Sequence, residues 1–161
     1  MSFMADLTEP LISRGLVARE AVEGCTDDEI ATLMRAQHVS QLPQSYREFL
    51  AYGGKNPYWL SHTGEWDFDW LVEAKDLARE IAEDYKKDFT PFEEGFVFQT
   101  HQGYMFYCFS AEDLSNPDPN FFIFTGNEPI RDSRQSFTQW LSGLADYLPE
   151  AIRLREELGL Q

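Results

Sequence analysis

The sequence predicts an α+β fold, with helices packed against an antiparallel-rich mixed sheet. Helical periodicity fills the first third of the chain, and strand-like segments then follow without strict one-by-one alternation with helices. Two aromatic segments joined by a short His-Gln-Gly turn indicate an antiparallel hairpin. The length of 161 residues suits one domain, so we expect a single domain over residues 1–161.

The first two helices are predicted from apolar spacing and from a capping pattern. Residues 6–18 place Leu7 and Leu11 at helical spacing. Thr26 begins the next helix, because Glu29 lies three residues later and completes a capping box.

The third helix has a proline at its start, three large apolar residues on one face and two glycines at its end. Proline suits the first helical position because its missing N–H has no partner there. Glycine accepts the left-handed backbone of a C-terminal cap. We assign this helix signature to maintaining the fold and not to binding. Its residues are Leu42, Pro43, Tyr46, Phe49, Leu50, Gly53 and Gly54.

Five segments are predicted as strands from their aromatic and β-branched residues. Residues 57–63 and 66–71 are short strand-like segments. Residues 96–100 and 104–109 form the hairpin, and residues 121–125 form a further strand.

Two helices are predicted in the second half of the chain. Residues 73–88 have apolar side chains along one side at helical spacing. Ser136 caps the last helix, with Gln139 at the reciprocal capping-box position. Pro149 is expected to kink or restart this helix and so to begin a C-terminal helical extension over 149–160.

The chain is strongly acidic, with 28 Asp and Glu against 13 Lys and Arg and a net charge of −15. Such a field repels phosphates and anionic membranes and attracts a basic protein, so neither nucleic acid nor membrane is an expected partner. No apolar run approaches the ~18 residues of a membrane span, and no signal-peptide pattern is present. The two cysteines, Cys25 and Cys108, are expected to be free thiols in a reducing compartment. We therefore expect a cytoplasmic protein.

The helix signature resembles that of the SUKH superfamily, which includes fungal Smi/Knr cell-wall regulators and many bacterial immunity proteins. Residues 101–107, 121–124 and 136–141 resemble later family segments, so the resemblance covers about 26–145. The acidic helix at 73–88 is a departure from the family pattern. The resemblance implies the family fold, no shared catalytic residues and a protein-binding role. Bacterial members resemble antidotes that neutralise toxin domains, often nucleases or deaminases, and fungal members resemble hub-like regulators.

Acidic residues concentrate in the middle of the chain. Residues 65–94 contain eleven acids and four bases, which leaves a local net charge of −7. Like charges three or four residues apart cost a helix a few tenths of a kcal/mol per pair. We interpret the acids as a surface for a basic partner, with an ordinary solvated helix face as the alternative. The predicted partner-binding residues are Glu65, Asp67, Asp69, Glu73, Asp76, Glu80, Glu83 and Asp84.

Two tryptophans in the same region are candidate anchors for a partner. On a strand, Trp66, Phe68 and Trp70 would share one face, and Asp67 and Asp69 would share the other. Strict alternation of this kind is more typical of a core row. At a sheet edge, however, an exposed Trp66 or Trp70 could anchor a partner, because binding hot spots are rich in tryptophan.

Catalytic interpretations have less support in the sequence. Phosphate-binding, dinucleotide-binding and nucleophile-elbow motifs are absent. His62, Glu65 and His101 lack the spacing and ligand number of an ordinary metal site, so no metal or cofactor is expected. Cys108 lies inside a predicted aromatic strand, so we expect it to be a small buried apolar residue and not a nucleophile.

The sequence thus predicts a non-enzymatic protein-binding domain that acts as a monomer or weak homodimer. In its sharpest form, the hypothesis is an immunity-type protein that covers the basic active-site surface of a toxin. A regulatory scaffold of the same fold and a small enzyme with an unrecognised pocket are the alternatives.

Overall fold

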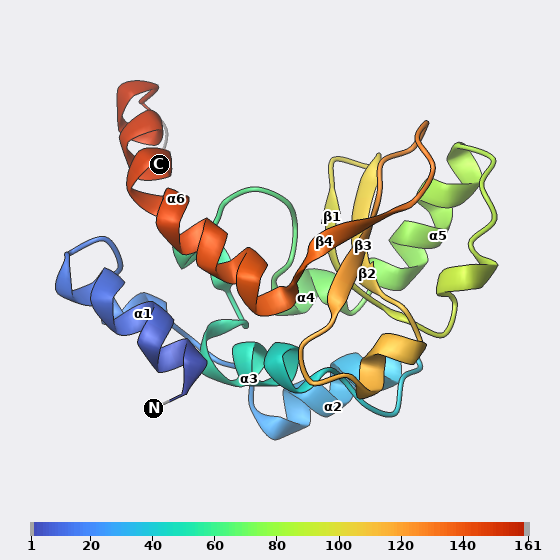
Figure 1. Ribbon diagram of the computed structural model, residues 1–161, viewed down its shortest axis with the longest axis horizontal. Helices are drawn as coiled ribbons and strands as arrows, with labels where there is room; N and C mark the ends of the chain where they lie inside the picture. The colour runs from blue at the N-terminus through green and yellow to red at the C-terminus, as the bar shows by residue number, and fades with distance from the viewer. Residues whose placement is uncertain (1, 160–161) are drawn as a thin grey trace.

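A computed structural model of the protein describes residues 2–159 (Figure 1). Its α-helices are α1 (Phe3–Ser13), α2 (Asp27–Ala36), α3 (Gln44–Gly53), α4 (Phe68–Leu71), α5 (Ala74–Asp84) and α6 (Phe137–Glu157). Its strands are β1 (Phe96–His101), β2 (Met105–Phe109), β3 (Asn120–Phe124) and β4 (Arg131–Ser136). The strands follow one another in the order β1-β2-β3-β4, and each pair is antiparallel. The predicted α+β class is confirmed, although the described sheet is wholly antiparallel and not mixed.

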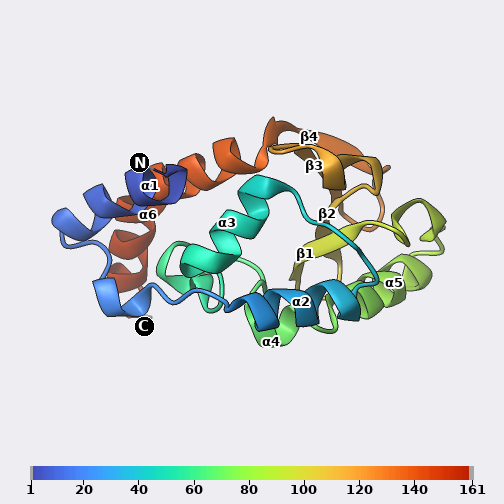
Figure 2. The same ribbon diagram turned by 90° about the horizontal axis from the view of Figure 1, so that it is seen from below.

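Helices cover both faces of the sheet. Helices α3 and α6 lie on one side, and α5 lies on the other against β1 and β2 (Figure 1). Seen from below, α1 lies beside α6, while α2, α4 and α5 run along one side of the molecule (Figure 2). Because both faces are covered, the first five residues of β1 are all buried, without the in–out alternation of a half-exposed strand.

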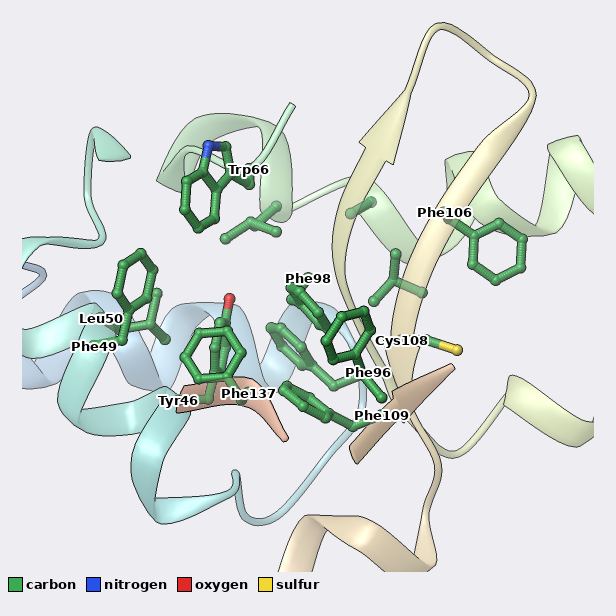
Figure 3. Packing of buried hydrophobic residues seen from close by; sticks show 14 of the residues in the cluster. Tyr46, Phe49, Leu50, Trp66, Phe96, Phe98, Phe106, Cys108, Phe109 and Phe137 are labelled. Atoms are coloured by element: carbon green, nitrogen blue, oxygen red, sulfur yellow. The ribbon is translucent and has the colours of Figure 1, made fainter. Parts of the chain in front are cut away.

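Aromatic rings fill the space between α3, α6 and the sheet (Figure 3). Phe98 stacks on Phe109 with ring centroids 4.7 Å apart, and Tyr46 of α3 packs edge-on against Phe137 of α6 at 5.2 Å. Phe49 lies parallel to Trp66 at 5.3 Å. Such pairs contribute about 0.5–1.5 kcal/mol each beyond the area that they bury.

A second aromatic group packs on the α5 side of the sheet. Phe106 stacks on Phe124 at 4.7 Å and meets the edges of Phe89 and Phe92. Helix α5 approaches this side through small residues, of which Ala74, Ala78 and Ala82 are fully buried. The helix therefore lies close to the sheet while burying little side-chain volume.

The apolar residues of the helix signature are buried as predicted, but the two glycines act differently from the prediction. Gly53 is the last residue of α3, and Gly54 has a φ of −92°, so the left-handed backbone is not used. A Cβ on Gly53 would lie 2.9 Å from the Trp59 ring, and the Trp59 indole donates to the Gly53 carbonyl at 2.8 Å. These glycines permit close packing. Pro43 stands at the N-cap, one residue before the helix begins.

The outer edge of β1 is occupied by groups from other parts of the chain. The Gln37 side chain donates to the Val97 carbonyl and accepts from the Val97 N–H, both at 2.8 Å, as a neighbouring strand would. The same amide donates to the Leu71 carbonyl at 3.0 Å. Further along, Glu65 pairs with Thr100 in an isolated antiparallel bridge. An edge satisfied in this way is protected from pairing with another chain.

Two predicted strands are wrong. Residues 57–63 contain a short 3-10 helix, Pro57–Trp59. Residues 66–71 contain the whole of the short helix α4, because the Asp67 side chain caps it by accepting from the Trp70 N–H. Strand β4 was not predicted from the sequence, and Pro149 does not interrupt α6.

The capping boxes and the hairpin are confirmed. Thr26 with Glu29, and Ser136 with Gln139, form reciprocal bonds at the starts of α2 and α6. The hairpin turn has Gln102 at φ +50° and Gly103 at φ +77°, the left-handed conformations that a tight turn between twisted strands needs. Helix α5 covers 74–84 of the predicted 73–88.

Candidate functional site

Helix α5 separates charged from apolar residues. Its buried side, mostly alanine with Ile81, faces the sheet, and its acids project outward. Glu73 precedes the helix, and Asp69 belongs to the separate short helix α4. We call this surface the acidic face. All its members are exposed: Asp69, Glu73, Asp76, Glu80, Glu83 and Asp84.

Few basic side chains balance the acidic face. Asp76 pairs with Arg79 at 2.7 Å, and no other member has an ion-pair partner within residues 2–159. Arg79 is itself committed elsewhere, because its guanidinium holds both oxygens of Glu93 at 2.8 Å. This two-pronged bond lowers the pKa of Glu93. Five of the six carboxylates are therefore left without a cation of the described chain.

Glu65 and Asp67 were predicted to bind the partner, but the structure gives both of them internal contacts. Glu65 accepts from the Thr100 hydroxyl and from the Gln102 N–H, each at 3.2 Å. Asp67 caps α4 and accepts from the Tyr58 hydroxyl at 2.6 Å. Burial, followed by this bond to Asp67, raises the pKa of Tyr58 to about 12.

The two tryptophans lie in different environments, because α4 ends the alternation that a strand would have imposed. Trp66 is 1% exposed and stacked on Phe49, so it cannot serve as a surface anchor. Trp70 is 39% exposed. Its indole N–H donates to the Thr100 hydroxyl at 2.7 Å, which ties the ring to the end of β1.

A small hollow opens beside Trp70, between α4, α5 and the β1–β2 turn. It has a volume of about 130 Å³ and is open to solvent at its rim. We call it the Trp70 hollow. Its lining residues are Glu65, Trp70, Leu77, Glu80, Ile81, Asp84, Thr100 and Gly103. It joins the acidic face to the only one of the two predicted anchors that reaches the surface.

Lys75 is a buried cation on the inner side of α5 and was not among the residues predicted to be functional. It is 3% exposed, and its ammonium donates to the carbonyls of Gln37 and Glu93, the latter at 2.7 Å. Burial lowers its pKa to about 8. Helical spacing was the one available signal, because Lys75 lies three residues before Ala78 and seven before Ala82 on the buried side of α5.

The groups considered for metal binding or catalysis do not come together. No three His, Cys, Asp or Glu side chains in residues 2–159 are arranged to hold a metal ion. Glu65 lies 3.8 Å from His101 Nδ1, whereas His62 lines a separate hollow of about 340 Å³ beside α6. Cys25 and Cys108 are both buried and free, and burial raises the pKa of each thiol to about 12. Such thiols are poor nucleophiles near neutral pH.

No helix within residues 2–159 combines the length and the apolar character that crossing a bilayer requires.

Comparison with known proteins gives one match. The family model described as SMI1 / KNR4 family (SUKH-1) matches residues 24–143. This range runs from the segment before α2 into the first turns of α6, so it includes the whole sheet and the acidic face. Neither the curated proteins nor the solved structures contain a significant match.

Proposed function

Because the chain belongs to the SMI1 / KNR4 family (SUKH-1), we propose that it is a protein-binding domain whose acidic face docks a basic partner. Membership fits an immunity role or a Smi1/Knr4-type regulatory role in general terms. Domains of this family are generally not enzymes. The choice of surface and of partner charge rests on the chain's own residues.

The observation that carries the proposal is the set of unpaired carboxylates around an exposed tryptophan. Five exposed acids on and beside α5 have no cation in the described chain, and two of them, Glu80 and Asp84, line the same hollow as Trp70. A solvated helix face gains nothing from such like-charge repulsion, whereas a basic partner converts it into attraction. Tryptophan at the border supplies the apolar contact that charged surfaces lack.

An immunity-type role is the form of this function that we propose. A toxin that cuts or modifies nucleic acid must present a cationic groove to a polyanion. A domain with a net charge of −15 can occupy that groove and exclude the substrate by both shape and charge. In this role the acidic face imitates the charge of the nucleic acid.

The test uses the chain as bait in low-salt capture, followed by identification of the captured protein and measurement of its affinity. We expect a basic protein whose binding weakens as salt rises. Glu80→Gln with Asp84→Asn should weaken binding about tenfold, because two exposed charge pairs are lost. The matched control, Asp146→Asn with Glu156→Gln, removes the same charge from α6, where both residues are exposed, and should leave the affinity unchanged.

Two outcomes would change the conclusion. A partner that is not basic, or one that is equally insensitive to both double variants, contradicts docking through the acidic face. The immunity role is tested separately, by expressing the partner with and without the chain. A partner that is harmless alone rules out toxin neutralisation and leaves the regulatory role.

A further inference from the structure

The Trp70 hollow has the size of a receptor for one side chain. Its volume of about 130 Å³ corresponds to the space of roughly four water molecules. That is too little for a backbone segment and enough for the end of one long side chain. The hollow lies at the border of the acidic face, so a partner docked there would present a side chain to it.

The lining of the hollow combines carboxylates with apolar walls. Glu80 and Asp84 stand one helical turn apart on α5, and Leu77 and Ile81 lie beside them. None of the described residues that line the hollow is basic. An occupant therefore meets carboxylates and apolar surface in the same hollow, which suits a cation carried on an apolar stem.

Internal hydrogen bonds hold the tryptophan and one carboxylate in place. The indole N–H of Trp70 donates to the Thr100 hydroxyl at 2.7 Å, and this hydroxyl donates to Glu65 Oε1 at 3.2 Å. The ring's only donor is thus already used, so the ring offers an occupant its π surface. Glu65 Oε2 makes no hydrogen bond to the described residues, and His101 Nδ1 lies 3.8 Å from it. A fixed aromatic surface beside a carboxylate that is already held in place requires little rearrangement on binding.

We propose that the Trp70 hollow receives a single arginine side chain of the partner. This rests on the proposed function, of which it specifies the central contact. A guanidinium is planar and weakly hydrated, so it stacks on an indole while its five N–H groups donate to carboxylates around its edge. A lysine ammonium is compact and strongly hydrated, so it fits an aromatic wall less well.

The experiment titrates the ¹⁵N-labelled chain at low salt with the peptide acetyl-Gly-Arg-Gly-amide. Its readout is the indole N–H signal of Trp70, assigned by comparison with Trp70→Phe. We expect this signal to shift and saturate. The lysine peptide should bind about threefold more weakly, in keeping with the smaller stacking contribution of an ammonium. The citrulline peptide, a neutral analogue of nearly the same shape, should leave the signal unmoved.

Charge variants show whether the carboxylates of the hollow are responsible. Glu80→Gln with Asp84→Asn should lower the affinity of the chain for the arginine peptide about fivefold. The control, Asp146→Asn with Glu156→Gln, should leave this affinity unchanged. A Trp70 signal that stays still, never saturates, or responds equally to arginine and lysine overturns the inference. Since the peptide assay needs no natural partner, its failure is distinct from failure of the proposed function. A basic partner that docks on the acidic face without moving Trp70 would remove this inference alone.

Discussion

Helices α3 and α5 pack on opposite faces of the same sheet, yet they present different chemistry to it. Helix α3 inserts Tyr46, Phe49 and Leu50 into the aromatic core (Figure 3). Helix α5 buries three alanines, Ile81 and one lysine, Lys75, and keeps its carboxylates outside. Helix α3 itself thus buries large apolar side chains, whereas α5 buries mainly small ones, tolerates charge and carries the proposed site. Substitutions in the two helices should therefore alter different properties.

The largest expected effect comes from the α3 side. Phe49→Ala removes a ring that is 1% exposed and packed against Trp66, Tyr46 and Phe137. We expect the free energy of unfolding to fall by about 3–5 kcal/mol, as measured by denaturant titration. Glu48→Ala, at an exposed position of the same helix, is the control and should change it by less than about 0.5 kcal/mol. Equal effects of the two substitutions would show that the Phe49 ring does not contribute to the core.

A smaller effect is expected from Lys75, on the inner side of α5. Its pKa is about 8 in the folded chain against an ordinary value of 10.5, because burial disfavours the charged form. Below pH 8 the Lys75 ammonium is charged in both the folded and the unfolded chain. Folding then carries the full free-energy cost of burying this charge. Between pH 8 and 10.5 the folded chain loses this proton before the unfolded chain does. The unfolded state then binds more protons, so the free energy of unfolding rises with pH.

The measurement compares the wild-type chain with Lys75→Met from pH 7 to 10.5. The wild type should gain about 2–3 kcal/mol relative to the variant across this range, given 1.36 kcal/mol per pKa unit. The comparison is needed because the raised pKa values of Cys25 and Cys108 act in the opposite direction, and both chains contain these thiols. A difference that stays constant with pH would mean that Lys75 is not charged and buried as the structure has it.

The sequence predicted elements that depend on local chemistry. The capping boxes at Thr26 and Ser136 and the hairpin turn at Gly103 were recognisable because each is formed by residues within three positions of one another. Strand β4 was missed because Arg131–Ser136 is polar throughout and acquires its strand conformation by pairing with β3. Residues 66–71 were wrongly predicted as a strand because their aromatic residues alternate as in a strand. In the structure the Asp67 side chain caps a short helix there.

The candidate site depends more on tertiary packing, so the sequence revealed only part of it. The exposed acids of α5 follow from helical spacing alone. The Trp70 hollow does not, because it needs Trp70 beside Thr100, thirty residues later in the chain. The contacts of Glu65 with Thr100 and Gln102 were hidden for the same reason. The Asp67 cap is local, but the alternating aromatics around it favoured a strand.

The smallest expected change in stability is also the one that separates folding from binding. Glu80 and Asp84 are like charges four residues apart on α5, so Glu80→Gln with Asp84→Asn should raise the free energy of unfolding by a few tenths of a kcal/mol or leave it unchanged. The same double variant should weaken binding to a basic partner about tenfold. Thermal denaturation and affinity measured on one preparation test both expectations together.

Phe49→Ala should show the reverse, a large loss of stability with near-normal affinity in the fraction that remains folded. If neutralising Glu80 and Asp84 instead destabilised the chain by more than ~1 kcal/mol, these carboxylates would have a structural task, and repulsion between them would no longer argue for a partner.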